Sequence, residues 1–191
     1  MLIYLHGFNS SPRSHKARVL GDYLAARGLA HRYACPALPH RPVEAIAAAE
    51  AIIEAHPDSC LVGSSLGGFY ATHLAEKHGL KAVLINPAID PHVGLRAYLG
   101  PQQNLHSGEP YELSEAHLEQ WAQQYLPVVT PSRYLLLVET GDEVLDYRCA
   151  VERYQGARQV IVAGGDHTLQ SFPRHLRLIL EFAGLPAELA F

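Results

Sequence analysis

The chain has 191 residues, of which 48% are hydrophobic and 18% are charged, a balance that suits a folded globular protein and excludes a largely disordered one. Its formal net charge of −4 gives no electrostatic reason to expect nucleic acid or an anionic membrane as a partner. The cysteines form no C-x-x-C pair, and the apolar run at the N-terminus is too short for a signal peptide or a membrane span, so we expect one cytoplasmic domain over residues 1–191.

Short apolar runs alternate with helical segments along the chain. Most of the runs are continuously apolar, which is typical of strands covered on both faces of a parallel sheet. The capping residues and the glycine or proline stops of the segments between them indicate helices. We predict an α/β fold of about six mostly parallel strands with helices on both faces. The strands are expected at 2–5, 31–35, 59–63, 81–86, 133–139 and 158–163, and the helices at 11–27, 41–55, 66–79, 114–126, 144–156 and 171–184.

Residues 87–113 interrupt this alternation. They are rich in Pro, Gly, His and Asn and show no clear period. Long irregular stretches inside compact domains are usually functional or mobile. We therefore expect a short cap segment near 87–126.

The stretch GSSLG, residues 63–67, follows a predicted strand and opens a predicted helix, which is the setting of a nucleophile elbow with the pattern G-x-S-x-G. The turn is sharp, so the residues two positions to either side of the nucleophile must be small. Those neighbours are glycines for Ser65 but Val62 and Leu66 for Ser64. Ser65 is therefore the candidate nucleophile. The alternative is a glycine-rich turn that only packs a helix close to a strand.

A serine nucleophile needs a base, and the base needs a carboxylate that orients it. In a fold of this kind the acid and then the histidine follow the serine, each in a loop after a strand. His167 lies in such a loop, whereas His175 falls within the apolar periodicity of the last helix. Asp142 is the candidate acid and Asp146 the runner-up; capping the next helix is the alternative role for Asp142.

Two backbone N–H groups are needed to hold the oxyanion of a tetrahedral intermediate. We expect them from Leu66, at the start of a helix, and from Phe8, in the loop after the first strand. His6 precedes the serine, the wrong order for the base, so we expect it only to support that loop. We expect Arg13 and Lys16 on a solvated helix face, with contact to an anionic substrate group as the alternative.

The cap segment supplies the candidate substrate-binding residues Tyr98, Tyr111 and Trp121. For each of them, ordinary packing onto the core is the alternative. A cap this short predicts a shallow site that accepts small or extended acyl groups.

Together, the stretches YLHGFNSSP, GSSLGGFYA, NPA, TGDEVLDY and GGDH resemble the small bacterial α/β-hydrolase esterases of the YqiA type, over nearly the whole chain. The resemblance implies a truncated α/β-hydrolase fold that lacks the usual first antiparallel strands. It also implies esterase activity on short acyl esters, with Ser65, Asp142 and His167 as the catalytic triad.

From these observations we predict a serine esterase that cleaves carboxylic esters of short to medium acyl chains through an acyl-enzyme. Such an enzyme needs no metal and no organic cofactor. Its partner would be a small-molecule acyl ester or thioester, not nucleic acid or a membrane. An acyl-CoA thioesterase is the alternative within enzymes, and a non-catalytic binding or scaffold module on the same fold is the alternative from another class.

Overall fold

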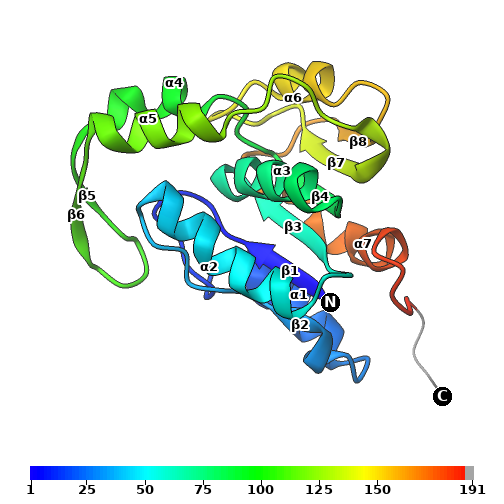
Figure 1. Cartoon of the computed structure of the whole chain (residues 1–191). Coiled ribbons are helices and arrows are strands. Elements are labelled where there is room, and N and C mark those ends of the chain that lie inside the picture. The colour runs from blue at the N-terminus through cyan, green and yellow to red at the C-terminus, as the bar shows by residue number, and fades with distance from the viewer. Residues whose placement is uncertain (188–191) are drawn as a thin grey trace.

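The centre of the molecule is a parallel sheet, shown in Figure 1 in a computed structural model that describes residues 1–187. The sheet has 6 strands in the order β2-β1-β3-β4-β7-β8, and every neighbouring pair is parallel. The predicted fold is therefore confirmed, although β2 is only 2 residues long. The strands are β1 Leu2–Leu5, β2 Tyr33–Ala34, β3 Cys60–Ser64, β4 Lys81–Ile85, β7 Tyr134–Glu139 and β8 Arg158–Val162.

Helices cover both faces of the sheet, as Figure 1 shows. Successive strand residues point to opposite faces, so Ile3 and Leu5 pack with α2 and α3, whereas Leu2 and Tyr4 pack with α1 and α7. The two resulting cores explain why the central strands are apolar without alternation. The helices are α1 His15–Ala25, α2 Pro42–Ala55, α3 Leu66–His78, α5 Glu115–Gln124, α6 Tyr147–Arg153 and α7 Leu176–Phe182.

Some helix ends differ from the prediction. α1 begins at His15 because Ser11 to Ser14 form a turn, closed by the Ser14 N–H on the Ser11 carbonyl at 3.0 Å. The last helix is preceded by a separate 3₁₀ turn over Phe172–His175. The expected domain end at residue 191 lies outside the described residues. Within residues 1–187, no helix combines the length and the apolar character needed to cross a bilayer.

The expectation of an irregular segment over 87–113 is wrong. This segment contains α4 Pro91–Gly94, a 3₁₀ turn over Leu95–Tyr98, and an antiparallel hairpin of β5 Gly100–Gln103 and β6 Pro110–Leu113. The hairpin sequences GPQQ and PYEL lack β-branched residues and carry prolines, so they give little strand signal.

The hairpin is held by contacts from outside its own sequence. The Asn104 side chain donates to the Ser10 carbonyl at 2.9 Å, and the Leu105 N–H donates to the Asn9 carbonyl at 3.0 Å. The Asn9 side chain in turn donates to Gln102 at 3.1 Å. The hairpin therefore lies against the loop that follows β1.

Candidate active site

The turn between β3 and α3 places Ser65 in a backbone conformation that few residues adopt. Its φ is 54° and its ψ is −121°, a strained combination for a residue with a side chain. A Cβ at Gly63 would overlap the Gly67 carbonyl, and a Cβ at Gly67 would overlap the Leu5 carbonyl. The turn thus requires glycine two residues to either side of Ser65. This is the steric requirement that distinguished Ser65 from Ser64 in the sequence. Ser64 is buried as the last residue of β3.

Three side chains that are far apart in sequence meet at the carboxyl edge of the sheet. His167 Nε2 lies 3.1 Å from Ser65 Oγ, and His167 Nδ1 lies 2.8 Å from Asp142 Oδ2 and 3.0 Å from Oδ1. The Asp142 side chain is 1% exposed and that of His167 is 21% exposed. An ionised Asp142 accepts the Nδ1–H, which leaves Nε2 as the acceptor for the serine proton. This is the hydrogen-bonded order of nucleophile, base and orienting acid.

The other nearby carboxylates have different partners. Asp146 accepts the Arg148 N–H at 3.0 Å and caps α6. Glu143 accepts the backbone N–H of His167 at 3.0 Å, and Asp166 binds groups of its own loop. None of these three carboxylates reaches the imidazole ring of His167.

The Asp142 carboxylate also takes the capping role that we considered as its alternative. Its Oδ1 accepts the N–H groups of Val144 at 2.9 Å and Leu145 at 2.8 Å. The two roles coexist, because a carboxylate offers about four lone-pair positions. The hydrogen bonds from these two backbone N–H groups hold the carboxylate in the orientation in which it contacts the imidazole.

The loop that carries His167 donates backbone hydrogen bonds to a buried carboxylate, that of Glu139, which was not among the predicted site residues. Glu139, the last residue of β7, is 1% exposed. It accepts backbone N–H groups from Ser171 at 2.7 Å, Asp166 at 2.9 Å and Gln170 at 3.0 Å. Burial alone would raise the pKa of the Glu139 carboxyl, but these hydrogen bonds outweigh it and hold the pKa below its usual range.

Asn86, at the end of β4, supports the same loop. Its side-chain amide donates to the carbonyls of Asp166 at 3.2 Å and His167 at 3.1 Å, and its own carbonyl accepts the Glu139 N–H at 3.2 Å. The sequence signal that could have identified both residues is a polar side chain that closes a buried apolar strand, as in VLIN and LLLVE.

The loop after β1 packs directly against the turn that carries Ser65. A Cβ at Gly7 would lie 3.2 Å from the Ser65 Cβ and 3.3 Å from the Ser64 carbonyl. Beside this contact, the amides of Phe8 and Leu66 donate no hydrogen bond to any other residue between 1 and 187. Both amides are therefore available to a ligand.

His6 sets the direction of the Phe8 amide. Its Nε2 accepts the Leu38 N–H at 3.0 Å, so the neutral ring carries its proton on Nδ1, which lies 3.1 Å from the Gly7 carbonyl. The Gly7 carbonyl and the Phe8 N–H belong to one planar peptide and point in opposite directions. Burial lowers the pKa of His6 and thereby favours this neutral form. His6 supports the loop, as expected.

The candidate substrate-binding residues of the cap have different positions. Tyr98 is 51% exposed, and its ring lies edge-on to Phe8 with 6.2 Å between centroids. Tyr111 donates its hydroxyl to Asn9 at 2.7 Å. Trp121 is fully buried and donates its indole N–H to the Tyr70 hydroxyl at 2.9 Å. This corrects the expectation for Trp121, which packs in the core and does not face a substrate.

Lys16 is only partly buried, but its side chain is not free in solvent as expected. Its ammonium donates to the Thr168 carbonyl at 2.8 Å and so joins α1 to the loop of His167. Burial lowers the pKa of Lys16 to about 8, although the nearby Asp166, Asp142 and Glu139 act in the opposite direction.

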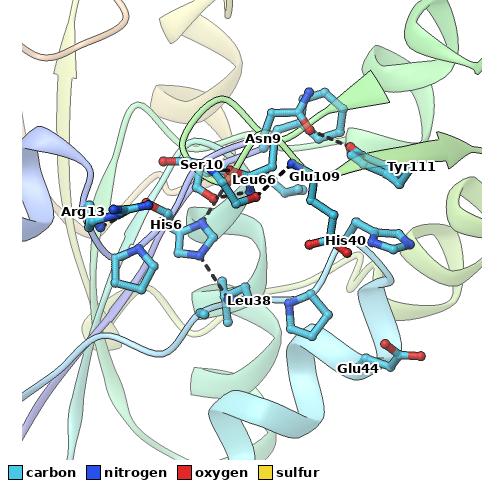
Figure 2. Close-up of a pocket in the computed structure, with 18 of the residues that line it drawn as sticks. His6, Asn9, Ser10, Arg13, Leu38, His40, Glu44, Leu66, Glu109 and Tyr111 are labelled. Carbon is cyan, nitrogen blue, oxygen red and sulfur yellow. Dashed lines mark hydrogen bonds between the residues drawn. The ribbon is translucent and has the colours of Figure 1, made fainter. Parts of the chain in front are cut away.

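A cavity of about 430 Å³ opens beside the turn that carries Ser65. Figure 2 shows it between the loop after β1, the loop after β2 and the β5–β6 hairpin. Its lining includes Phe8, Leu66, Tyr70 and Tyr111, but neither Ser65 nor His167.

Comparison with known proteins identifies the family. The family model described as "Uncharacterised protein family (UPF0227)" matches residues 1–184. The chain belongs to the UPF0227 family. A UPF0227 protein of Serratia proteamaculans (strain 568) is 24% identical over 191 residues, which cover 97% of this chain and 100% of that protein. The resemblance given by the sequence motifs is thus confirmed.

Solved structures similar to this UPF0227 chain are α/β hydrolases. Alpha/beta hydrolase domain-containing protein 10 from mouse has a TM-score of 0.73 at 16% identity, with 94% of this chain and 87% of that chain covered. The esterase domain of a Rhodothermus marinus protein has a TM-score of 0.67 at 20% identity, with 95% and 85% covered. These similarities confirm the predicted α/β-hydrolase fold.

Proposed function

We propose that this UPF0227 protein is a serine esterase that cleaves carboxylic esters of short to medium acyl chains through an acyl-enzyme. The observation that carries the proposal is the hydrogen-bonded chain from Ser65 through His167 to Asp142. The fold alone would not support it, because one fold hosts many functions.

In the acylation step, His167 Nε2 takes the hydroxyl proton while Ser65 Oγ forms a bond to the ester carbonyl carbon. Asp142 stabilises the imidazolium that results. The amides of Phe8 and Leu66 donate to the oxyanion of the tetrahedral intermediate. The carbon–oxygen bond to the alcohol then breaks, and the alcohol leaves with the proton from Nε2.

Deacylation repeats the same proton transfers with water. His167 Nε2 removes a proton from water, and the water oxygen attacks the acyl-serine. Collapse of the second intermediate returns the proton to Ser65 Oγ and releases the carboxylic acid. We favour oxygen esters over acyl-CoA thioesters, because both candidate partners for a CoA phosphate already donate to backbone carbonyls, Lys16 to that of Thr168 at 2.8 Å and Arg13 to that of His106 at 3.2 Å.

Active-site labelling tests this proposal. A fluorophosphonate probe should label the wild type on Ser65, as located by peptide mass spectrometry, and Ser65→Ala should lose both the label and the hydrolysis of nitrophenyl acetate. Ser64→Ala is the matched control and should keep the label. A label that persists in Ser65→Ala, or hydrolysis that is equal in both proteins, would show that Ser65 is not the nucleophile.

A further inference from the structure

The cavity opens directly beside the proposed nucleophile. Gly7 lines it, and a Cβ at Gly7 would lie 3.7 Å from Ser65 Oγ. Leu66, the residue after the serine, and Phe8 line it as well. A substrate held on Ser65 with its oxyanion on these amides therefore has the cavity next to its carbonyl carbon.

The position of the base indicates which half of the ester the cavity can receive. The leaving alcohol must take its proton from His167 Nε2, so it must lie near His167. The cavity is lined by segments within 6–13, 37–44, 66–70 and 104–111, and no residue of the His167 loop contributes to it. The cavity is thus available to the acyl half of the ester.

The hairpin side of the cavity wall offers hydrogen-bond acceptors. Figure 2 shows the Glu109 carboxylate reaching down from the hairpin beside His40, with the Glu44 carboxylate on the same side and Arg13 on the opposite side. Glu109 is exposed, and its carboxylate makes no ion pair and accepts no hydrogen bond from any residue between 1 and 187. Its carboxylate is free to accept a hydrogen bond from a ligand.

The α3 side of the wall includes a buried tyrosine. Tyr70 is 3% exposed and lines the cavity. Its hydroxyl oxygen accepts the Trp121 indole N–H, and within the described part of the chain its own proton has no acceptor. Burial raises the pKa of Tyr70, so the hydroxyl keeps that proton. A plain alkyl group beside it would leave this donor unpaired, which is costly in a buried site.

We infer that the cavity binds an acyl group with a hydroxyl substituent, because a hydroxyl is both a donor for Glu109 and an acceptor for Tyr70. The inference rests on the proposed esterase function and names its substrate class. A site built to hydrogen-bond a hydroxyl discriminates against the analogue that lacks it, since its polar groups are then left unpaired.

A matched set of esters tests the inference. The wild type should hydrolyse methyl ω-hydroxyhexanoate with a kcat/KM about tenfold above that of methyl heptanoate, in which a methyl replaces the hydroxyl. The isomeric ω-hydroxypentyl acetate, with the hydroxyl on the alcohol half, should show no such preference over hexyl acetate. A higher kcat/KM for methyl ω-aminohexanoate than for the hydroxy ester would overturn the assignment of a hydroxyl.

Variants locate the effect in the cavity. Glu109→Gln and Tyr70→Phe should each lower the ratio of hydroxyacyl to alkyl kcat/KM about fivefold or more. Glu112→Gln, an exposed residue of the same hairpin outside the cavity lining, should leave the ratio unchanged. An unchanged ratio in Glu109→Gln would overturn the inference even if Tyr70→Phe fails to fold.

The outcomes separate this inference from the proposed function. Hydrolysis of methyl heptanoate that depends on Ser65, without a preference for the hydroxy ester, overturns the inference alone. Loss of the Ser65-dependent hydrolysis of every ester, including nitrophenyl acetate, overturns the proposed function and the inference with it.

Discussion

Glu139→Gln tests whether one buried carboxylate holds the loop that carries His167. The N–H groups of Asp166 and Gln170 donate to Oε2 at 2.9 and 3.0 Å, and that of Ser171 donates to Oε1 at 2.7 Å. A glutamine has one oxygen, which keeps two of these bonds when it occupies the Oε2 position. Its NH₂ group then faces the Ser171 N–H, which loses its acceptor.

The cost follows from these contacts. An unsatisfied buried donor costs about 1–3 kcal/mol, and a hydrogen bond weakens by about 1 kcal/mol when its charged acceptor becomes neutral. Two weakened bonds and one lost bond, less the easier burial of a neutral amide, give a destabilisation of about 3 kcal/mol. Because the loop holds the imidazole, esterase activity should fall as well.

Urea unfolding at neutral pH, followed by circular dichroism, measures this loss as a lower midpoint at an unchanged slope. Glu181→Gln is the control, because this exposed residue pairs with Arg177 one turn away on α7 and should cost less than about 0.5 kcal/mol. A free energy of unfolding for Glu139→Gln within about 1 kcal/mol of the wild type would refute the reasoning.

The same pair of proteins should differ in acid. Since the pKa of Glu139 is lowered in the folded chain, its contribution is complete above the unfolded pKa of about 4.3 and is lost as the pH falls through the folded pKa. The difference in unfolding free energy between wild type and variant should therefore be constant near neutral pH and shrink below about pH 4.

Three further predictions concern the site and its supports. Asp142→Asn should lower the kcat for nitrophenyl acetate by about three orders of magnitude, and Asp146→Asn by less than about threefold. The reverse result would show that Asp146, not Asp142, is the acid that orients His167. Gly7→Ala places a Cβ 3.2 Å from that of Ser65, which should displace the serine and reduce kcat at least about tenfold. A kcat equal to that of the wild type would show that the contact between Gly7 and Ser65 does not position the serine. The pKa of Lys16 in the folded chain is about 8, so above this pH the unfolded chain binds more protons than the folded one. The unfolding free energy of the wild type should therefore increase between about pH 8 and 10, and that of Lys16→Met should lack this increase. Urea titrations that give both proteins the same dependence of unfolding free energy on pH would refute this.

The strands and the three side chains of the candidate site, Ser65, Asp142 and His167, could be predicted from the sequence for a common reason. The central strands are apolar runs, and parallel strands end at the same edge of the sheet. Ser65, Asp142 and His167 each follow such a strand, so chain order alone brings them to one edge. Their separations did not need to be known for the residues to be chosen.

The remaining features depend on contacts that no local pattern encodes. The β5–β6 hairpin has weak strand residues and is held by Asn9, about ninety residues earlier in the chain. Trp121 lies on the buried face of α5, and its partner, the Tyr70 hydroxyl, belongs to a helix far away in the sequence. In the sequence, Glu139 is only a polar residue at the end of a strand, because the loop residues that donate to its carboxylate come about thirty positions later.

The backbone contacts at the elbow also mark where this protein can be redesigned. A Cβ at Gly63 or Gly67 would overlap a carbonyl, and one at Gly68 would lie 2.6 Å from the Pro87 Cβ. Variant libraries should therefore keep these three codons fixed. The tip of the hairpin over residues 104–109 is mostly exposed and contributes to the cavity. Substitutions there should change the cavity wall without touching Ser65, Asp142 or His167, provided that Asn104, which holds the loop after β1, is kept.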